Sequence, residues 1–450
     1  MTMIPQVAQA MQTVFTDQAD EAARLSGFCQ RTSALGGRIF AQAMTFGCLA
    51  NPLPTLDNFC NAAATAGARV SPQAFDKRFG PASAEFLRLT LANAVNQVVA
   101  SEPLAVGLLS RFTSVLIQDS TTVSLPDCLD TIWKGTGGRV EANTRSAVKF
   151  QVRLDLRSGQ LTGPFPDHGK SSDSKSCLQL DDPPVGGLRI ADLGYFELDV
   201  FTRIDRGDAY WLSRWQHGTA LYLPKVGRIK LTEWLAKQTG NSIDIKVEIG
   251  CNHHLRGRLV AIRVPDEVAE IRRKRLMEKA RDKGKPVSAD RLALCAWTLL
   301  LTNIPETLAS TTELAVLARC RWQIELLFKL WKSGGGLWKA AARLGKSRSE
   351  KPYRILTEVY ARLVAAVVQH WILVAGCWNQ PNRSLVKAAK AVRVQVMGLI
   401  GGLRGLVSLE GILQTIILSL SAGTKIHRSK KDPRTHQIIS DPSHYGVSLS

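Results

Sequence analysis

The sequence predicts a mixed α/β protein in which a strand-rich core is flanked by helical N- and C-terminal regions. The hydrophobic period indicates this order. It is helical up to about residue 100, alternates as in strands between about residues 114 and 302, and is helical again to about residue 420. Apolar residues make up 45% of the chain and charged residues 21%, as in folded proteins. A length of 450 residues exceeds one core and predicts two to four units.

The N-terminal region is Ala-rich and carries local helix signals. Residues 56–66 have helical spacing, Gly67 begins a turn, and Ser71 before Pro72 is a helix N-cap with proline at the first position. Two short helices around a glycine turn favour either a helix-turn-helix or an ordinary helical hairpin, and the sequence leaves both open.

Alternating apolar residues predict a series of strands in the middle of the chain. The strands are expected at residues 114–118, 147–156, 188–191, 195–204, 210–215, 220–223, 243–249, 258–264 and 297–302. Residues 157–160 supply the turn after the second strand. Residues 267–283 instead predict a densely basic helix, which could follow a DNA backbone or be an ordinary solvated helix.

Two aspartates are expected where strands end. Asp119 follows the apolar run 115–118, and Asp192 follows 188–191. A carboxylate at the end of a buried strand is held rigidly at the sheet edge where α/β folds place ligands, although aspartate is also an ordinary turn former. Together with Glu325, the two aspartates would suit two hard divalent ions and attack at a phosphodiester.

Residues 317–332 predict one helix with two faces. At about 100° per residue, Arg321, Lys329 and Lys332 fall within roughly 40° of Glu325. The separate apolar face consists of Leu317, Ile324, Leu327, Phe328 and Trp331. An acid among cations suits a metal ligand beside phosphate-binding groups, or a solvated face with i,i+4 ion pairs. Ser333 and the glycines after it predict the end of the helix.

Charge and cysteine content narrow the class of protein. The formal net charge of +20 favours a polyanion, with nucleic acid ahead of an anionic membrane. Nine cysteines without a CxxC pair predict reduced thiols, and the ligands at residues 251–254 are too crowded for zinc. The sequence lacks Walker, dinucleotide and GxSxG signatures, so ATP, NAD and serine-nucleophile chemistry are not implied.

The longest apolar stretch, residues 355–376, contains Glu358, Arg362 and His370, and predicts a buried helix rather than a membrane span. The N-terminus lacks the charged start and apolar run of a signal peptide. We therefore expect a cytoplasmic protein without a membrane partner.

In order along the chain, these motifs resemble the DDE transposases of bacterial insertion sequences, in the IS-four family. That family's signature is a tyrosine, two residues, an arginine, three residues, a glutamate, six residues and a lysine. Arg321, Glu325 and Lys332 match it, whereas Ala318 stands at the tyrosine position. Residues 119–121 resemble the first-aspartate motif, 191–196 the second, and 299–304 a segment that precedes the glutamate.

The resemblance implies a ribonuclease H-like catalytic core with a β-rich insertion. Four regions are then expected: a helical DNA-binding domain at 1–105, the core at 106–340 with its insertion at about 205–290, a helical region for synapsis or dimerisation at 341–424, and a flexible basic tail at 425–450.

The resemblance also implies a site and an activity. Asp119, Asp192 and Glu325 would bind two Mg²⁺ or Mn²⁺ ions, while Arg321, Lys329 and Lys332 would contact DNA phosphates. The protein would bind the inverted repeats at the element's ends, cleave double-stranded DNA and join it to target DNA, as a homodimer in the synaptic complex. A catalytically inactive DNA-binding relative and a metal-dependent nuclease without strand transfer are the alternatives.

Overall fold

The computed structural model describes residues 3–104, 107–137, 145–282, 284–334, 352–380, 383–425 and 439. The chain forms two compact units, each assembled from separate stretches of sequence. Unit 1 comprises Met1–Leu104, Ser120–Ser171 and Ile324–Arg428; unit 2 comprises Ala105–Asp119, Ser172–Gln323 and Ser429–Ser450. The expected tail at 425–450 lies outside the described residues except for Lys425 and Ile439, as do residues 341–351. The mixed α/β class is confirmed.

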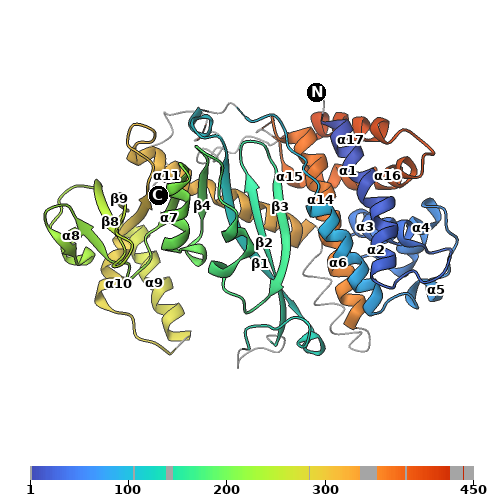
Figure 1. Cartoon of the computed structure of the whole chain (residues 1–450), viewed down its shortest axis with the longest axis horizontal. Helices are drawn as coiled ribbons and strands as arrows, with labels where there is room; N and C mark the ends of the chain where they lie inside the picture. Colours follow the sequence, from blue (N-terminus) through green and yellow to red (C-terminus); the bar gives the residue numbers. More distant parts are fainter. Residues whose placement is uncertain are drawn as a thin grey trace. The chain divides into compact units, whose positions relative to one another are not determined.

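Unit 1 is mainly helical. Its helices are α1 (Ile4–Phe15), α2 (Asp17–Leu25), α3 (Gly37–Ala50), α4 (Leu56–Thr65), α5 (Pro72–Asp76), α6 (Pro81–Val95), α14 (Pro352–Cys377), α15 (Leu385–Val394), α16 (Val396–Leu403) and α17 (Leu409–Gly423). Figure 1 shows the blue N-terminal helices beside the orange C-terminal ones, with α14 against α6 and α3. The two helical regions that the sequence separates therefore build one core.

Local capping signals in the N-terminal region are confirmed. The Ser71 hydroxyl accepts a hydrogen bond from the Ala74 amide at 3.2 Å, and Pro72 opens α5. Because α5 is only five residues long, it gives the expected second helix less than two turns. The choice between a helix-turn-helix and a helical hairpin stays open.

Stacked aromatic rings fill the N-terminal part of the unit 1 core. Phe28 stacks on Phe86 and Phe40 on Phe75, with ring centroids 5.0 and 5.3 Å apart. Arg78 lies 3.9 Å from the centre of the Phe28 ring and donates a hydrogen bond to the Phe28 carbonyl at 2.9 Å. Arg78 therefore acts in folding, through cation–π and hydrogen-bond contacts.

Helix α14 is the central helix of unit 1. Among the described helices it alone is long and apolar enough to cross a membrane, but 89% of its most apolar window is buried in the protein. Helix α14 also contains buried charged side chains. Glu358 pairs with Arg354 at 3.1 Å and Arg362 at 3.6 Å, and Arg354 reaches Asp76 of α5 at 2.9 Å. These contacts confirm the expectation of a buried helix at this position.

Unit 1 also contains a strand hairpin. Strand β2 (Ser146–Asp155) pairs antiparallel with β3 (Leu161–His168), which the sequence reasoning missed. In the turn between them, Gly159 has φ +73°, and an added Cβ would lie 2.8 Å from the Trp378 ring. The Gly159 carbonyl accepts a hydrogen bond from His370 of α14 at 2.7 Å. The turn is thus fixed by the C-terminal helices.

Unit 2 contains a sheet with helices around it. Its strands follow the order β1-β4-β5-β10-β9-β8-β6-β7, and β1 belongs to unit 2 only through Val115–Asp119. The elements are β1 (Val115–Leu125), β4 (Leu188–Ala191), α7 (Leu198–Arg206), β5 (Tyr210–Arg214), β6 (Leu221–Leu223), β7 (Gly227–Ile229), α8 (Leu231–Ala236), β8 (Ser242–Ile249), β9 (Leu255–Arg263), α9 (Asp266–Asp282), α10 (Ala289–Ala293), β10 (Trp297–Thr302) and α11 (Thr311–Cys320). β4 pairs in parallel with both β1 and β5, and the pairs from β5 onward are antiparallel.

Most predicted strands of unit 2 are confirmed, with two corrections. Residues 195–204 do not form a strand: α7 occupies 198–206, since Val200, Phe201 and Ile204 are spaced for the buried face of a helix. β1 does not end at Gln118 but continues to Leu125, because the β-branched residues that follow favour extended backbone. Asp119 therefore lies inside a strand.

In the core of unit 2, helix α7 packs against the sheet. The Phe201 ring of α7 stacks on Trp211 of β5, with centroids 4.5 Å apart. Asn303, just after β10, accepts a hydrogen bond from the Trp211 amide at 2.8 Å and donates to the Ala209 carbonyl at 2.9 Å. The motif at 299–304 thus locks β10 to the start of β5.

Candidate active site

The pairing of β1 with β4 brings Asp119 and Asp192 to the same level of the sheet. Gln118 and Ala191 are partners in this parallel register, and each aspartate is the next residue. Parallel strands in register carry successive residues forward together, so the two side chains meet at one end of β4. The sequence predicted both residues but not their pairing.

Arg321 joins the two aspartates. Its Nη1 lies 3.0 Å from Asp119 Oδ2, and its Nε lies 3.9 Å from Asp192 Oδ1. The side chains of Arg321 and Asp119 are 14% and 17% exposed, whereas that of Asp192 is 45% exposed. The Asp119 pair is therefore partly shielded from water, which strengthens it. All three residues belong to unit 2.

Helix α11 positions Arg321 at its C-terminal end. The helix starts with a capping box in which Ser310 accepts from the Glu313 amide and Glu313 bonds back to Ser310. Glu313 also pairs with Arg111 at 2.7 Å. Burial of Glu313 opposes its ionisation, but the hydrogen bonds from Arg111 and Ser310 outweigh burial and lower the pKa of this carboxyl. The Ser-x-x-Glu spacing of residues 310–313 is a sequence signal for this helix start.

The helix predicted over 317–332 is interrupted. α11 ends at Cys320, and α12 (Trp322–Lys329) follows and passes into a π-helical turn (Leu330–Gly334). The Arg321 amide bonds to the Arg319 carbonyl instead of to the preceding turn, so the ladder breaks although the backbone stays helical. The π-helical turn reaches Gly334, the first of the glycines expected to end the helix, and residues 335–351 lie outside the described part of the chain.

The apolar and charged faces predicted for residues 317–332 are partly confirmed. The predicted apolar side chains are all buried, namely Leu317, Ile324, Leu327, Phe328 and Trp331. Glu325 lies in the first turn of α12 and is half-buried, Lys329 is exposed, and Lys332 follows in the π-helical turn. These three residues belong to unit 1, so the approach of Glu325 to the aspartates stays a prediction. Ala318 is half-buried on α11, one turn before Arg321.

Asp119 and Asp192 provide the oxygen donors that hard divalent ions prefer. Across the described residues, no group of three or more His, Cys, Asp or Glu side chains is placed to hold an ion. Within the described part of the chain, the two aspartates are therefore a pair of candidate oxygen ligands. Their shared guanidinium shows that a positive charge is accommodated between them.

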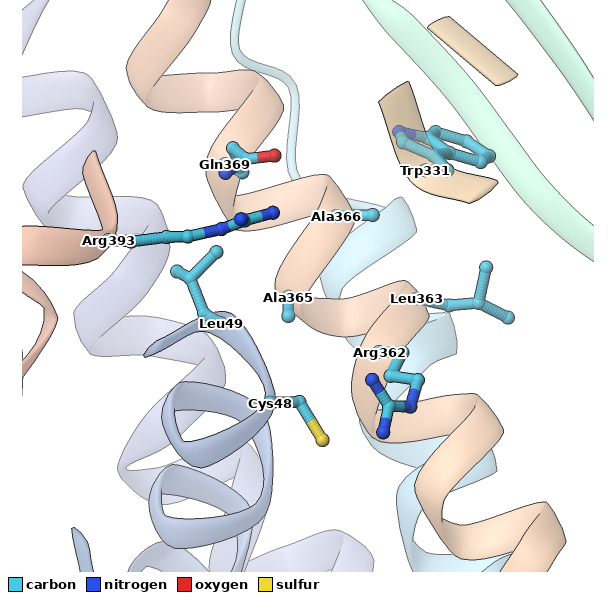
Figure 2. Close-up of a pocket in the computed structure, with 9 residues that line it drawn as sticks. All are labelled: Cys48, Leu49, Trp331, Arg362, Leu363, Ala365, Ala366, Gln369 and Arg393. Carbon is cyan, nitrogen blue, oxygen red and sulfur yellow. The ribbon is translucent and has the colours of Figure 1, made fainter. Parts of the chain in front are cut away.

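A cavity in unit 1 does not compete with this site. Figure 2 shows it between α3 and α14, with Cys48, Arg362 and Arg393 among its lining residues. Its volume of about 20 Å³ suits roughly one water molecule rather than a substrate. Burial raises the pKa of the Cys48 thiol to about 12, so this cysteine stays protonated and is no nucleophile.

The fold and the site define a class: a basic α/β protein with a pair of aspartates on two neighbouring parallel strands, one within β1 and one just after β4. Comparison with known proteins gives the family. The sequence profile described as "Transposase DDE domain" matches residues 110–368, more than half of the chain. The chain belongs to this family, and the resemblance seen in the sequence is confirmed. Membership supports the expected ribonuclease H-like core.

Several transposases are similar to this chain. The transposase for insertion sequence element IS231F of Bacillus thuringiensis subsp. israelensis is 29% identical over 67% of this chain and 65% of its own length. That for IS1151 of Clostridium perfringens is 26% identical, over 67% and 66%. The putative transposase InsL for IS186A of Escherichia coli (strain K12) is 38% identical over a shorter stretch, 24% and 28%. The chain thus spans just under two thirds of the first two relatives.

Proposed function

We propose that this protein is a metal-dependent DNA transposase that cleaves the ends of an insertion sequence and joins them to target DNA. The observation that carries the proposal is the convergence of Asp119 and Asp192 on Arg321 in a chain of the transposase DDE family. The net charge of +20 supports double-stranded DNA as the partner.

Asp119, Asp192 and Glu325 are the proposed metal ligands. The first two fit the role because their oxygens already converge on one cation. Bound Mg²⁺ or Mn²⁺, two ions per site, would supply Lewis-acid activation of the attacking hydroxyl and stabilisation of the departing oxygen. The protein's part is to hold Asp119 on a rigid strand and Asp192 at the neighbouring strand end.

Arg321, Lys329 and Lys332 are the proposed phosphate contacts. Lys329 is exposed, which suits a phosphate contact on DNA. Arg321 can leave the aspartates when metal neutralises them and then offer its guanidinium to a phosphate. Ala318 would remove one contact to the DNA backbone and no metal ligand.

The remaining parts of the proposal concern whole regions. The helices of 1–105 would bind inverted repeats, those of 341–424 would pair two ends in a homodimeric synapse, and the strands within about 205–290 would form an insertion in the core. A cytoplasmic location without a membrane partner fits the burial of α14.

The replacement Glu325→Gln tests the catalytic assignment. With Mg²⁺ and DNA carrying the element's ends, cleavage should fall by more than about 100-fold, the upper end of what loss of a supporting partner costs. DNA binding should persist, because the cations remain. The exposed acid Glu306 provides a matched control, and Glu306→Gln should cleave normally. Unchanged cleavage by Glu325→Gln would overturn the assignment.

The two alternatives predict different products. A nuclease would hydrolyse end DNA without joining it, whereas a transposase yields strand-transfer products that a gel resolves. An inactive DNA-binding relative, which Ala318 motivates, would bind end DNA and leave it intact with either Mg²⁺ or Mn²⁺.

A further inference from the structure

Helix α9 is the least buried long helix of unit 2. Of its 17 residues only Ala269 is buried. A helix that is polar all round gains little from packing and needs another source of stability or another role. Figure 1 shows α9 in yellow, next to α10.

The middle of α9 is attached to the rest of unit 2 by two arginines. Arg272 donates hydrogen bonds to the Trp297 carbonyl and to the Thr298 hydroxyl, both at 3.1 Å. Arg273 donates to the Leu292 carbonyl at 3.3 Å. These two cations are thereby used in fixing the helix, and they hold the half that follows in a defined position.

The half of α9 after Arg273 presents four cations to solvent. Lys274, Arg275, Lys279 and Arg281 are all exposed, and within the described residues none of them lies within ion-pair distance of an acid. One acid, Glu278, lies among them. The helix dipole explains cations in the last turn, such as Lys279 and Arg281, but not Lys274 and Arg275 farther back. Glu278, four residues after Lys274 and three after Arg275, offsets part of their mutual repulsion, but residues 274–282 still carry these four cations against two acids, Glu278 and Asp282.

We infer that this exposed half of α9 is a further DNA-binding site, which binds the phosphate backbone apart from the carboxylate site and from the helices of 1–105. The inference rests on the proposed function, since it assumes a DNA partner. Lys274 to Arg281 spans about 10 Å of helix, which matches the rise of about three phosphates along one strand of a duplex. The contacts are to phosphates, so they add affinity without reading sequence.

The test removes these charges while keeping the helix. A variant with Lys274, Arg275, Lys279 and Arg281 all replaced by Gln keeps good helix formers throughout α9. A matched control replaces the exposed Lys225, Arg228, Lys237 and Arg256 of the same unit by Gln, which removes the same charge elsewhere. Binding of a fluorescent duplex is measured by anisotropy between 50 and 200 mM salt, and circular dichroism checks the fold.

The α9 variant should bind at least about 10-fold more weakly at 100 mM salt, and its log–log salt slope should fall by about 2 to 4. Element-end and unrelated duplexes should lose the same affinity, and the control should match the wild type. Equal losses in the α9 variant and the control, or an unchanged slope, would overturn the site. So would a loss that affects anionic phosphatidylserine vesicles and not DNA.

These outcomes separate the inference from the proposed function. If the α9 variant binds DNA like the wild type while Glu325→Gln abolishes cleavage, the transposase proposal stands and the α9 site fails. If the wild type neither binds nor cleaves end DNA, both fail.

Discussion

Arg321 acts as a built-in counter-ion for the two aspartates. Two carboxylates at the same level of neighbouring strands repel each other, and the guanidinium at 3.0 Å from Asp119 and 3.9 Å from Asp192 offsets that repulsion. In the proposed function, divalent ions would bind the same two aspartates. Metal and Arg321 should therefore compete for the aspartates.

Replacement of Arg321 by Gln tests this competition. Without metal, the variant should lose about 1–3 kcal/mol of unfolding free energy, the range for hydrogen bonds to charged groups. Mn²⁺ should then stabilise the variant more than the wild type, since it no longer displaces a guanidinium. Urea unfolding in EDTA and in Mn²⁺ measures both effects.

The exposed pair Arg145 and Asp130 provides the control for this measurement. Arg145→Gln should change stability by less than about 1 kcal/mol and leave the Mn²⁺ effect as it is. An equal gain from Mn²⁺ in the wild type and in Arg321→Gln would contradict the competition.

Single residues of the site were predictable because their local signals are strong. Asp119 and Asp192 follow apolar runs, and Glu325 lies among cations. The partner of the aspartates was not predictable. Arg321 was expected to contact phosphate, and only the packing of α11 against the sheet shows it beside Asp119.

Among the elements of unit 1, helix α14 contains buried ion pairs and a buried histidine. Its ions are satisfied in pairs, and its His370 bonds to the Gly159 carbonyl in the β2–β3 turn. Burial lowers the pKa of His370 to about 4, although the hydrogen bond to Gly159 opposes the shift. The imidazole is therefore neutral in the folded protein at neutral pH.

This histidine should make unit 1 acid-sensitive. An unfolded histidine has a pKa of about 6.5. Between pH 6.5 and 4, the imidazole is therefore mostly protonated in the unfolded state and mostly neutral in the folded state. His370 should therefore cost the wild type about 2 kcal/mol of stability between pH 7 and pH 5. Urea unfolding at the two pH values measures the loss, and His370→Gln should lack this part of it.

The exposed His217 serves as the comparison for His370. His217→Gln should keep the pH dependence of the wild type, including the part that comes from carboxylates. If His370→Gln keeps it as well, the burial of His370 does not govern the acid sensitivity.

The sequence predicts an element correctly where its residues favour one kind of secondary structure, and wrongly where strand-like composition and helical spacing occur together. The strands β4, β8 and β10 show a clear period and were found nearly to the residue. The segment that forms α7 mixes aromatic and β-branched residues typical of strands with a helical spacing, and the spacing decided its structure. The apolar pattern predicts a strand end at Asp119 because the polar residues after it hide the continuation of β1.

The excess of positive charge belongs to the whole molecule. A chain with a formal net charge of +20 should bind DNA mainly through phosphates. If about six phosphates are contacted, affinity for any duplex should fall by roughly 1,000-fold between 50 and 200 mM salt.

Anisotropy titrations on element-end and unrelated duplexes measure this dependence. Both slopes should be steep, and the end sequence should bind more tightly at every salt concentration. An affinity that does not change with salt would contradict a phosphate-dominated interface.

The sequence by itself determined the class, the family and the candidate carboxylates, because periodicity, charge and short motifs are properties of neighbouring residues. The tertiary structure decided that N- and C-terminal helices share one core and that the β1–β4 register brings Asp119, Asp192 and Arg321 together. It also showed that two cations of α9, Arg272 and Arg273, anchor the helix, whereas Lys274, Arg275, Lys279 and Arg281 are exposed. Such contacts join residues far apart in the chain, and they depend on packing that no local pattern records.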